Sequence, residues 1–205
     1  MPLHIAVEGG GFHAKGASVA LGRAQLAAIA RVGPIAQAFA WDADAAKARQ
    51  FAHEMSESLG IAVDAVSLPD ATREAGILVT ATSSAKPFLA RALVRPGTFI
   101  AAVGADNPHK SELDADLFEG TKVVADSLEQ AAAMGDLHHA IEAGKATRES
   151  IHAELADIVA GRKSGRTNEA EITIFDSTGL AIEDVASAAV AYERARDQGR
   201  LRLRQ

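Results

Sequence analysis

The chain has 205 residues, of which 48% are hydrophobic and 23% charged, and its formal net charge is −6. This length and composition predict one sizeable hydrophobic core and exclude a disordered polypeptide. Cysteine is absent, which excludes disulfides, thiol nucleophiles and thiolate metal sites. The acidic balance argues against a nucleic-acid partner. Without a long apolar run or a charged leader, we expect a cytoplasmic protein that does not contact a membrane.

Short β-branched runs alternate with alanine-rich stretches along the chain. The predicted strands are Leu3–Val7, Gln37–Trp41, Ile61–Val66, Ile77–Thr82, Phe99–Gly104, Lys122–Asp126 and Glu171–Asp176. The predicted helices are Gly22–Val32, Ala43–Ser58, Lys86–Leu93, Leu128–Met134, His152–Ala160 and Ile182–Asp197. This alternation predicts an α/β fold: a Rossmann-like, mostly parallel sheet with helices on both faces. The stripe Ile182, Val185, Ala189 and Tyr192 of the last helix is expected to face the core.

An acid stands where a dinucleotide-binding unit needs one. Asp42 ends the run AFAW, 20 residues after Gly22. A carboxylate at this position binds both hydroxyls of the adenosine ribose and repels a 2′-phosphate, which favours NAD over NADP. Asp42 is equally well placed to be the N-cap of the next helix, and one residue can do both.

The glycine-rich turn that should precede this acid is irregular. If Gly22 is its third glycine, the first two positions fall on Ala17 and Val19, and a branched side chain blocks close approach of a pyrophosphate. The glycines at positions 9–11 follow a credible strand, but they lie too far from Gly22 for the usual spacing. The sequence therefore predicts a helix and an acid without the normal turn.

Two other strands end in small and hydroxyl side chains. One is followed by Thr80, Ala81, Thr82 and Ser83, which would let a flat cofactor lie against the backbone. The other leads into Ser177, Thr178 and Gly179, whose backbone N–H groups would face a carboxamide or an anion. An ordinary strand-to-helix turn with a capping hydroxyl explains the second stretch as well.

The segment FIAAVGADNPHKSELD, residues 99–114, carries the strongest indication of chemistry. An apolar strand stops at Val103 and Gly104, and Asp106 follows at once. Ligands of open α/β sheets bind at the carboxyl ends of strands, so a carboxylate beside a glycine that leaves room is placed to exchange a proton with a small molecule. The alternative is an Asp that caps the next turn. His109 is expected to face solvent, and the alternative is that it touches a substrate near Asp106.

The histidines give no reason to expect a metal site. His138 and His139 are neighbours on a predicted helix and should point in different directions. We therefore expect no metal ligands in this chain.

Three longer stretches together resemble the ornithine cyclodeaminase/mu-crystallin family: ILVTATSSAKPFL, PGTFIAAVGADNPHKSELDADLF and EITIFDSTGLAIEDVA. The resemblance covers residues 22–192. It implies an NAD-dependent enzyme such as an ornithine cyclodeaminase, an amino-acid dehydrogenase or a reductase of cyclic imino acids. It also implies that Asp106 is the catalytic acid/base, that Thr80–Ser84 line the cofactor with Val103 and Gly104 nearby, and that Asp176–Gly179 reach the nicotinamide.

The N-terminus departs from the family pattern. Residues 1–21 resemble a piece of the family's substrate-binding and dimerisation domain, and residues 22–205 resemble its NAD-binding domain. Lys15 matches a substrate-domain lysine, and we assign it a catalytic role on that basis alone. Most of the substrate domain and the first nucleotide-domain strand have no counterpart, so the chain resembles an internally shortened member. We expect Leu3–Val7 to take the place of the missing strand.

The resemblance implies a lyase or oxidoreductase of amino-acid metabolism, impaired by its missing portion. The family dimer is doubtful here, because its surface lies mostly in that portion. A non-catalytic, mu-crystallin-like binding protein for a nucleotide or another small molecule is the alternative, and an inactive remnant is a third reading.

Overall fold

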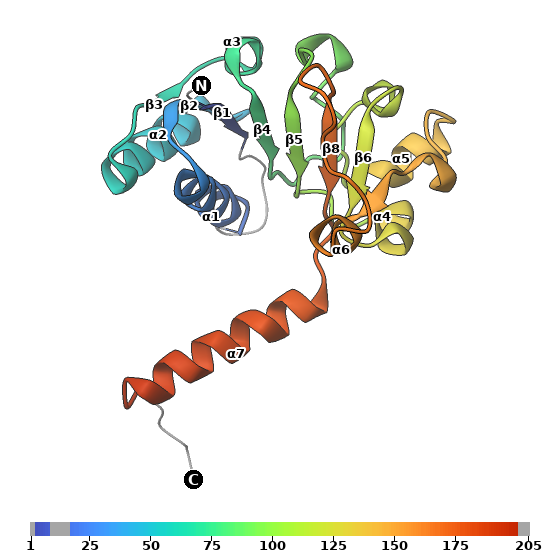
Figure 1. The fold of residues 1–205 in the computed structure, drawn as a ribbon. Coiled ribbons are helices and arrows are strands. Elements are labelled where there is room, and N and C mark those ends of the chain that lie inside the picture. The colour runs from blue at the N-terminus through green and yellow to red at the C-terminus, as the bar shows by residue number, and fades with distance from the viewer. Residues whose placement is uncertain (1–2, 9–16, 201–205) are drawn as a thin grey trace.

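Eight parallel strands form a single sheet in the computed structural model, which describes residues 3–8 and 17–200, with side chains from residue 20 onward. Their order is β3-β2-β1-β4-β5-β8-β6-β7 (Figure 1). The strands are β1 (Leu3–Glu8), β2 (Ile35–Trp41), β3 (Val63–Ala65), β4 (Ile77–Thr80), β5 (Phe99–Ala102), β6 (Lys122–Ala125), β7 (Ala153–Glu154) and β8 (Thr173–Asp176). The predicted Rossmann-like fold is confirmed, and every pairing between named strands is parallel.

The described residues form seven α-helices and three short 3₁₀ helices, and all of them except α7 lie between strands. The α-helices are α1 (Ala17–Val32), α2 (Ala45–Leu59), α3 (Leu68–Glu74), α4 (Leu128–Met134), α5 (Asp136–Glu142), α6 (Leu155–Val159) and α7 (Ala181–Asp197). The 3₁₀ helices are η1 (Arg91–Leu93), η2 (Ala115–Phe118) and η3 (Arg148–Ser150). None of the described helices has the length and hydropathy needed to cross a bilayer.

Strand β1 lies in the middle of the sheet. It pairs with β2 on one side and with β4 on the other, from Ile5 opposite Ile77 to Glu8 opposite Thr80. The expectation that Leu3–Val7 supplies the first strand is therefore confirmed. In the described part of residues 1–21, β1 belongs to the sheet and α1 begins at Ala17. The division into residues 1–21 and residues 22–205 stays a prediction, and so does the origin of residues 1–21 in a substrate-binding domain.

Apolar side chains alternate between the two faces of the sheet and fill two cores. Leu78, Ile100 and Ile174 point to one face, where α3, α4 and α5 cover them. Val79 and Ala101 point to the other face, where they join Leu26 of α1 and helix α2. Each fully buried Leu, Ile or Val side chain contributes about 1.5–3 kcal/mol to stability. The two cores fix the sheet and therefore the position of the loops that follow its strands.

Two helix predictions are wrong in an informative way. Lys86–Leu93 forms only the short η1, because Pro87 interrupts the segment and the N–H groups of Phe88 and Leu89 donate to the carbonyl of Glu112. The predicted helix His152–Ala160 starts three residues late, since Ala153–Glu154 first pairs with β6 as β7.

The last helix does not pack on the sheet. Figure 1 shows α7 leaving the end of β8 and extending away from the rest of the protein. Ile182 is 72% exposed, Val185 67% and Tyr192 56%, so the expectation that this stripe faces the core is wrong. The stripe has helical spacing, but a spacing shows only which residues share a face and not what covers that face.

Candidate active site

The carboxyl ends of four strands lie in register along one edge of the sheet. Thr80 at the end of β4 is opposite Ala102 of β5, which in turn is opposite Asp176 of β8. Asp176 is also opposite Ala125 at the end of β6. The loops after these strands contain the stretches singled out in the sequence. The fold therefore brings together residues that are almost 100 positions apart in the chain.

Asp106 lies in the loop after β5 and its side chain is 55% exposed. Its Oδ1 lies 2.7 Å from the ammonium nitrogen of Lys110 and accepts a hydrogen bond from the side-chain amide of Asn107 at 3.0 Å. Lys110 also donates to the carbonyl of Gly104 at 3.2 Å. These contacts hold the carboxylate in one orientation at the edge of the sheet while leaving it open to a solute. His109 is exposed, as expected.

A buried carboxylate, Glu112, fastens the loops on either side of Asp106. Its two oxygens accept hydrogen bonds from the Thr80 hydroxyl at 2.7 Å, the Thr82 backbone N–H and the Gly104 backbone N–H at 3.1 Å. The side chain of Glu112 is fully buried, and burial raises the pKa of its carboxyl. One side chain thus ties the ends of β4 and β5 together.

The role expected for Gly104 changes with this contact. A Cβ atom at position 104 would overlap the carboxylate of Glu112. The glycine therefore makes room for a side chain of the protein and not directly for a ligand.

Two further buried carboxyls lie behind this edge. Asp136 accepts hydrogen bonds from the backbone N–H groups of Glu112 and Leu113, at 2.7 and 3.0 Å. Asp176 accepts one from the N–H of Leu137 at 2.8 Å, in the first turn of α5. Desolvation raises the pKa of Asp136 well above its ordinary value, and the charges of Asp176 and Glu112 add to the effect. Desolvation likewise raises the pKa of Asp176 to about 7.

The turn after β8 is built around a fourth carboxylate, Asp126, at the end of β6. Its Oδ2 accepts hydrogen bonds from the Ser177 hydroxyl, the Thr178 N–H and the Gly179 N–H, at 3.0, 2.9 and 2.8 Å. The backbone N–H groups expected to face a ligand are therefore bound to the protein. The buried hydroxyl oxygen of Thr178 has no hydrogen-bond partner among the described residues, and contact of this turn with a cofactor stays a prediction.

The hydroxyl-rich stretch after β4 is largely occupied by the protein as well. The Thr80 hydroxyl donates to Glu112, and the Thr82 hydroxyl accepts a hydrogen bond from the N–H of Ser84. The hydroxyl hydrogen of Thr80 is therefore already donated, whereas the Thr82 hydroxyl only accepts and Ser83 is partly exposed. Ala81 is buried. Contact of this stretch with a cofactor stays a prediction.

Asp42 ends β2 beside a hollow of about 460 Å³, which is lined by residues of β2, β3, α2 and the intervening loops. The side chain is buried, and desolvation raises its pKa. Its Oδ1 accepts a hydrogen bond from the N–H of Asp44, and Asp44 is the N-cap of α2. The capping role is therefore not that of Asp42, which leaves the ribose role as its predicted function.

The glycines at positions 9–11 lie outside the described residues, and so does Lys15, while Ala17, Val19 and Gly22 of the expected phosphate-binding turn lie inside α1. Gly22 is buried inside α1, because this helix begins at Ala17 and not near Gly22 as expected. Its place in the second turn, four residues before the buried Leu26, suits close packing of the helix on the sheet. Contact of Gly22 with a cofactor stays a prediction.

A family model described as the ornithine cyclodeaminase/mu-crystallin family matches residues 15–199. The chain belongs to this family. The match contains every described element from α1 to α7, together with all of the loops at the carboxyl edge of the sheet. The resemblance seen in the sequence motifs is therefore confirmed.

Several members of the ornithine cyclodeaminase/mu-crystallin family are similar to this chain. An alanine dehydrogenase of Archaeoglobus fulgidus is 43% identical over 171 residues, which are 83% of this chain and 52% of that protein. The structure of Thermococcus litoralis Δ1-pyrroline-2-carboxylate reductase in complex with NADH and L-proline superposes with a TM-score of 0.89 at 38% identity. An archaeal alanine dehydrogenase dimer with bound NAD gives 0.86, also at 38% identity.

These two superpositions each cover 97% of this chain and 59% of the chain it is compared with. This family member thus spans somewhat more than half the length of the relatives that it matches.

Sequence reasoning placed Asp176 at the nicotinamide end of the site but gave no role to Glu112, Asp126 or Asp136. Asp126 follows the apolar strand β6 and Asp176 ends β8, and an acid in such a position is a recognisable signal. Glu112 and Asp136 follow no apolar run, and only the folded chain shows that they are buried. Lys110 lies four residues after Asp106, a spacing at which an ion pair could have been considered.

Proposed function

We propose that this chain is an NAD-dependent oxidoreductase domain that acts on a small amino acid or imino acid, with Asp106 as its acid/base. The exposed carboxylate of Asp106 at the carboxyl edge of the sheet is the observation that carries the proposal. Membership of the ornithine cyclodeaminase/mu-crystallin family and the NAD-containing relatives support it.

The described residues suit a dinucleotide. The strand order reverses between β1 and β4, and ligands of such sheets bind in the crevice at that point. Asp42 and the hollow beside it would hold the adenosine, while Ser83 and Thr178 lie on loops nearer the middle of the edge. A bound NAD supplies the acceptor or donor of a hydride.

The residues of the chain would move the proton and hold the substrate. An amino acid must be a neutral amine before its α-carbon can lose a hydride, and a carboxylate at Asp106 would accept the ammonium proton, directly or through water. In the reverse direction, the protonated Asp106 would return that proton to the nitrogen of an imine. Lys110 keeps the accepting oxygen fixed through the 2.7 Å contact.

The relatives narrow the choice of substrates to be tested. Relatives include dehydrogenases and imine reductases, so alanine and cyclic imino acids are the first substrates to examine. Ornithine cyclisation with ammonia release belongs to the same proposal, because it begins with the same proton and hydride transfers.

The change of Asp106 to Asn tests the acid/base role. We expect turnover with alanine or with Δ1-pyrroline-2-carboxylate to fall by about 100-fold or more, because the amide cannot accept the proton. The dissociation constant for NADH, measured by calorimetry, should stay within about twofold, since Asp106 is not expected to hold the cofactor. An Asp184→Asn variant on the exposed α7 is the matched control. Turnover by Asp106→Asn equal to that of the unchanged protein would refute the role.

A second function is the binding of NADH without catalysis, which the hollow beside Asp42 supports. It predicts that NADH binds while no amino acid or imino acid is converted. Failure to bind NADH at all would refute both functions.

A further inference from the structure

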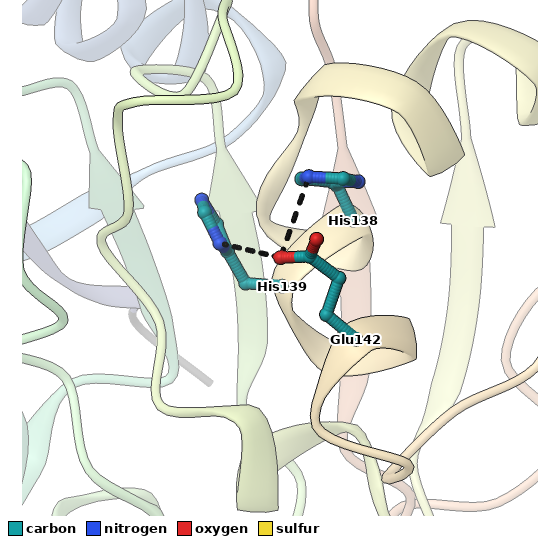
Figure 2. Close-up of side chains that lie close together, drawn as sticks. All are labelled: His138, His139 and Glu142. Carbon is teal, nitrogen blue, oxygen red and sulfur yellow. Dashed lines mark ion pairs between the residues drawn. The ribbon is translucent and has the colours of Figure 1, made fainter.

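We propose that His138, His139 and Glu142 on α5 form a binding site for a divalent transition-metal ion, with Zn²⁺ as the best match. The three side chains converge in Figure 2. The Nε2 atom of His138 lies 3.5 Å from Glu142 Oε2, and the Nδ1 atom of His139 lies 3.9 Å from the same oxygen. The expectation that the two histidines diverge is therefore wrong: one is four and the other three residues before Glu142, and both spacings reach one face of a helix.

The hydrogen bonds of the two imidazoles fix which nitrogens are free. His138 Nδ1 lies 3.2 Å from the carbonyl oxygen of Ala132, and His139 Nε2 lies 2.8 Å from that of Lys110. A carbonyl only accepts, so each of these nitrogens carries the hydrogen. In the neutral rings, the lone pairs of the other two nitrogens then face the carboxylate. This is the arrangement in which a second hydrogen bond orients a metal-binding histidine.

Two lone pairs and a carboxylate oxygen repel one another unless a cation lies between them. The cation is either a proton on an imidazole or a metal ion. The three ligand atoms lie within 4.8 Å of one another. A tetrahedral site with Zn–N bonds of about 2.0–2.1 Å needs ligand atoms about 3.3 Å apart. The nitrogen–oxygen distances of 3.5 and 3.9 Å are close to this value, and the two ring nitrogens, which lie within 4.8 Å of each other, must approach by no more than about 1.5 Å. Water would supply the fourth ligand.

The ligand set selects the class of ion. Two imidazoles and one carboxylate suit Zn²⁺, Co²⁺ or Ni²⁺, whereas Ca²⁺ and Mg²⁺ prefer oxygen ligands only. The histidine side chains are 23% and 27% exposed and that of Glu142 is 64% exposed, which gives an ion access from solvent while the rings stay held.

Helix α2 offers a matched control. His53 and Glu57 have the same spacing as His138 and Glu142, with 3.7 Å between Nε2 and the carboxylate. Both side chains are more than 70% exposed, and in the described part of the chain only the α5 group brings three such ligands together. The α2 pair should therefore bind an ion much more weakly.

The test is titration of the purified chain with Zn²⁺ by calorimetry, with Co²⁺ absorption as a second readout. His138→Asn keeps a donor for the Ala132 carbonyl and His139→Gln keeps one for the Lys110 carbonyl, yet each lacks the ligand nitrogen. Glu142→Gln removes the carboxylate with little change of shape.

We expect one Zn²⁺ per chain, with at least a tenfold loss of affinity in each of the three variants and no loss in His53→Asn. The visible bands of bound Co²⁺ should disappear in the same three variants only. Equal Zn²⁺ affinity in the unchanged protein and the three variants, or an equal loss in His53→Asn, would overturn the proposal. No step of this test depends on NAD or on turnover.

Discussion

Replacement of Asp176 by Asn should change how the stability of the protein depends on pH. The carboxyl is fully buried, and its pKa is raised from 3.8 to about 7, mainly by desolvation and also by the charges of Asp126 and Glu112. Asn is neutral at every pH, has the same shape and keeps an oxygen for the N–H of Leu137. The substitution therefore removes the titration and retains the contact.

The sign follows from the protons bound in each state. Between pH 3.8 and about 7 the folded protein holds a proton at Asp176 that the unfolded chain has released. Lowering the pH through this window therefore stabilises the fold, and raising it removes that stability. Between about pH 8 and about pH 5.5 the calculated gain is about 2 kcal/mol for this group.

Urea unfolding at several pH values, with linear extrapolation to water, measures the effect. The free energy of unfolding of the unchanged protein minus that of Asp176→Asn should rise by about 2 kcal/mol from about pH 8 to about pH 5.5. The same difference for Asp184→Asn, at an exposed position on α7, should stay constant. A pH-independent difference for Asp176→Asn would show that this carboxyl does not hold a proton in the fold.

Two further substitutions examine how the loops are fastened. Gly104→Ala places a Cβ against the Glu112 carboxylate and should lower the free energy of unfolding by about 2 kcal/mol, whereas Gly76→Ala, whose nearest neighbour would be an Arg95 nitrogen at 3.8 Å, should change it by less than about 0.5 kcal/mol. Equal effects would contradict the proposed contact. Asp126→Ala removes the acceptor of the Thr178 and Gly179 N–H groups, and their hydrogen exchange should become at least about tenfold faster. Unchanged protection in that variant would mean that another group holds the turn.

The sheet could be predicted from the sequence because each strand is encoded by a short run of neighbouring residues. Runs such as Ile77–Thr82 and Phe99–Gly104 are apolar throughout, as strands covered on both faces must be. Because the predicted strands are parallel, their carboxyl ends share one edge of the sheet, so the loops after β4, β5 and β8 were expected there. Asp106 was found on this basis, and its exposure agrees with the proposed role.

The contacts inside the loops could not be predicted, because they join residues far apart in sequence. Nothing in the local pattern indicates that Glu112 reaches Thr82 or that Asp126 reaches Gly179. The backbone N–H groups of Thr178 and Gly179 looked available because their acceptor comes from another strand. The prediction that the apolar face of α7 packs against the core failed for the same reason, because periodicity does not identify what a helix packs against.

The four buried carboxylates have a consequence for how this edge can change in evolution. Glu112, Asp126, Asp136 and Asp176 each hold at least one main-chain N–H group, and the main chain is the same whatever residue stands at that position. A side chain that projects from these loops without fastening them, such as the partly exposed Ser83, can therefore be exchanged without moving the loop that carries it. Substitutions at such projecting positions are therefore expected to alter the surface of this edge while its loops keep their geometry.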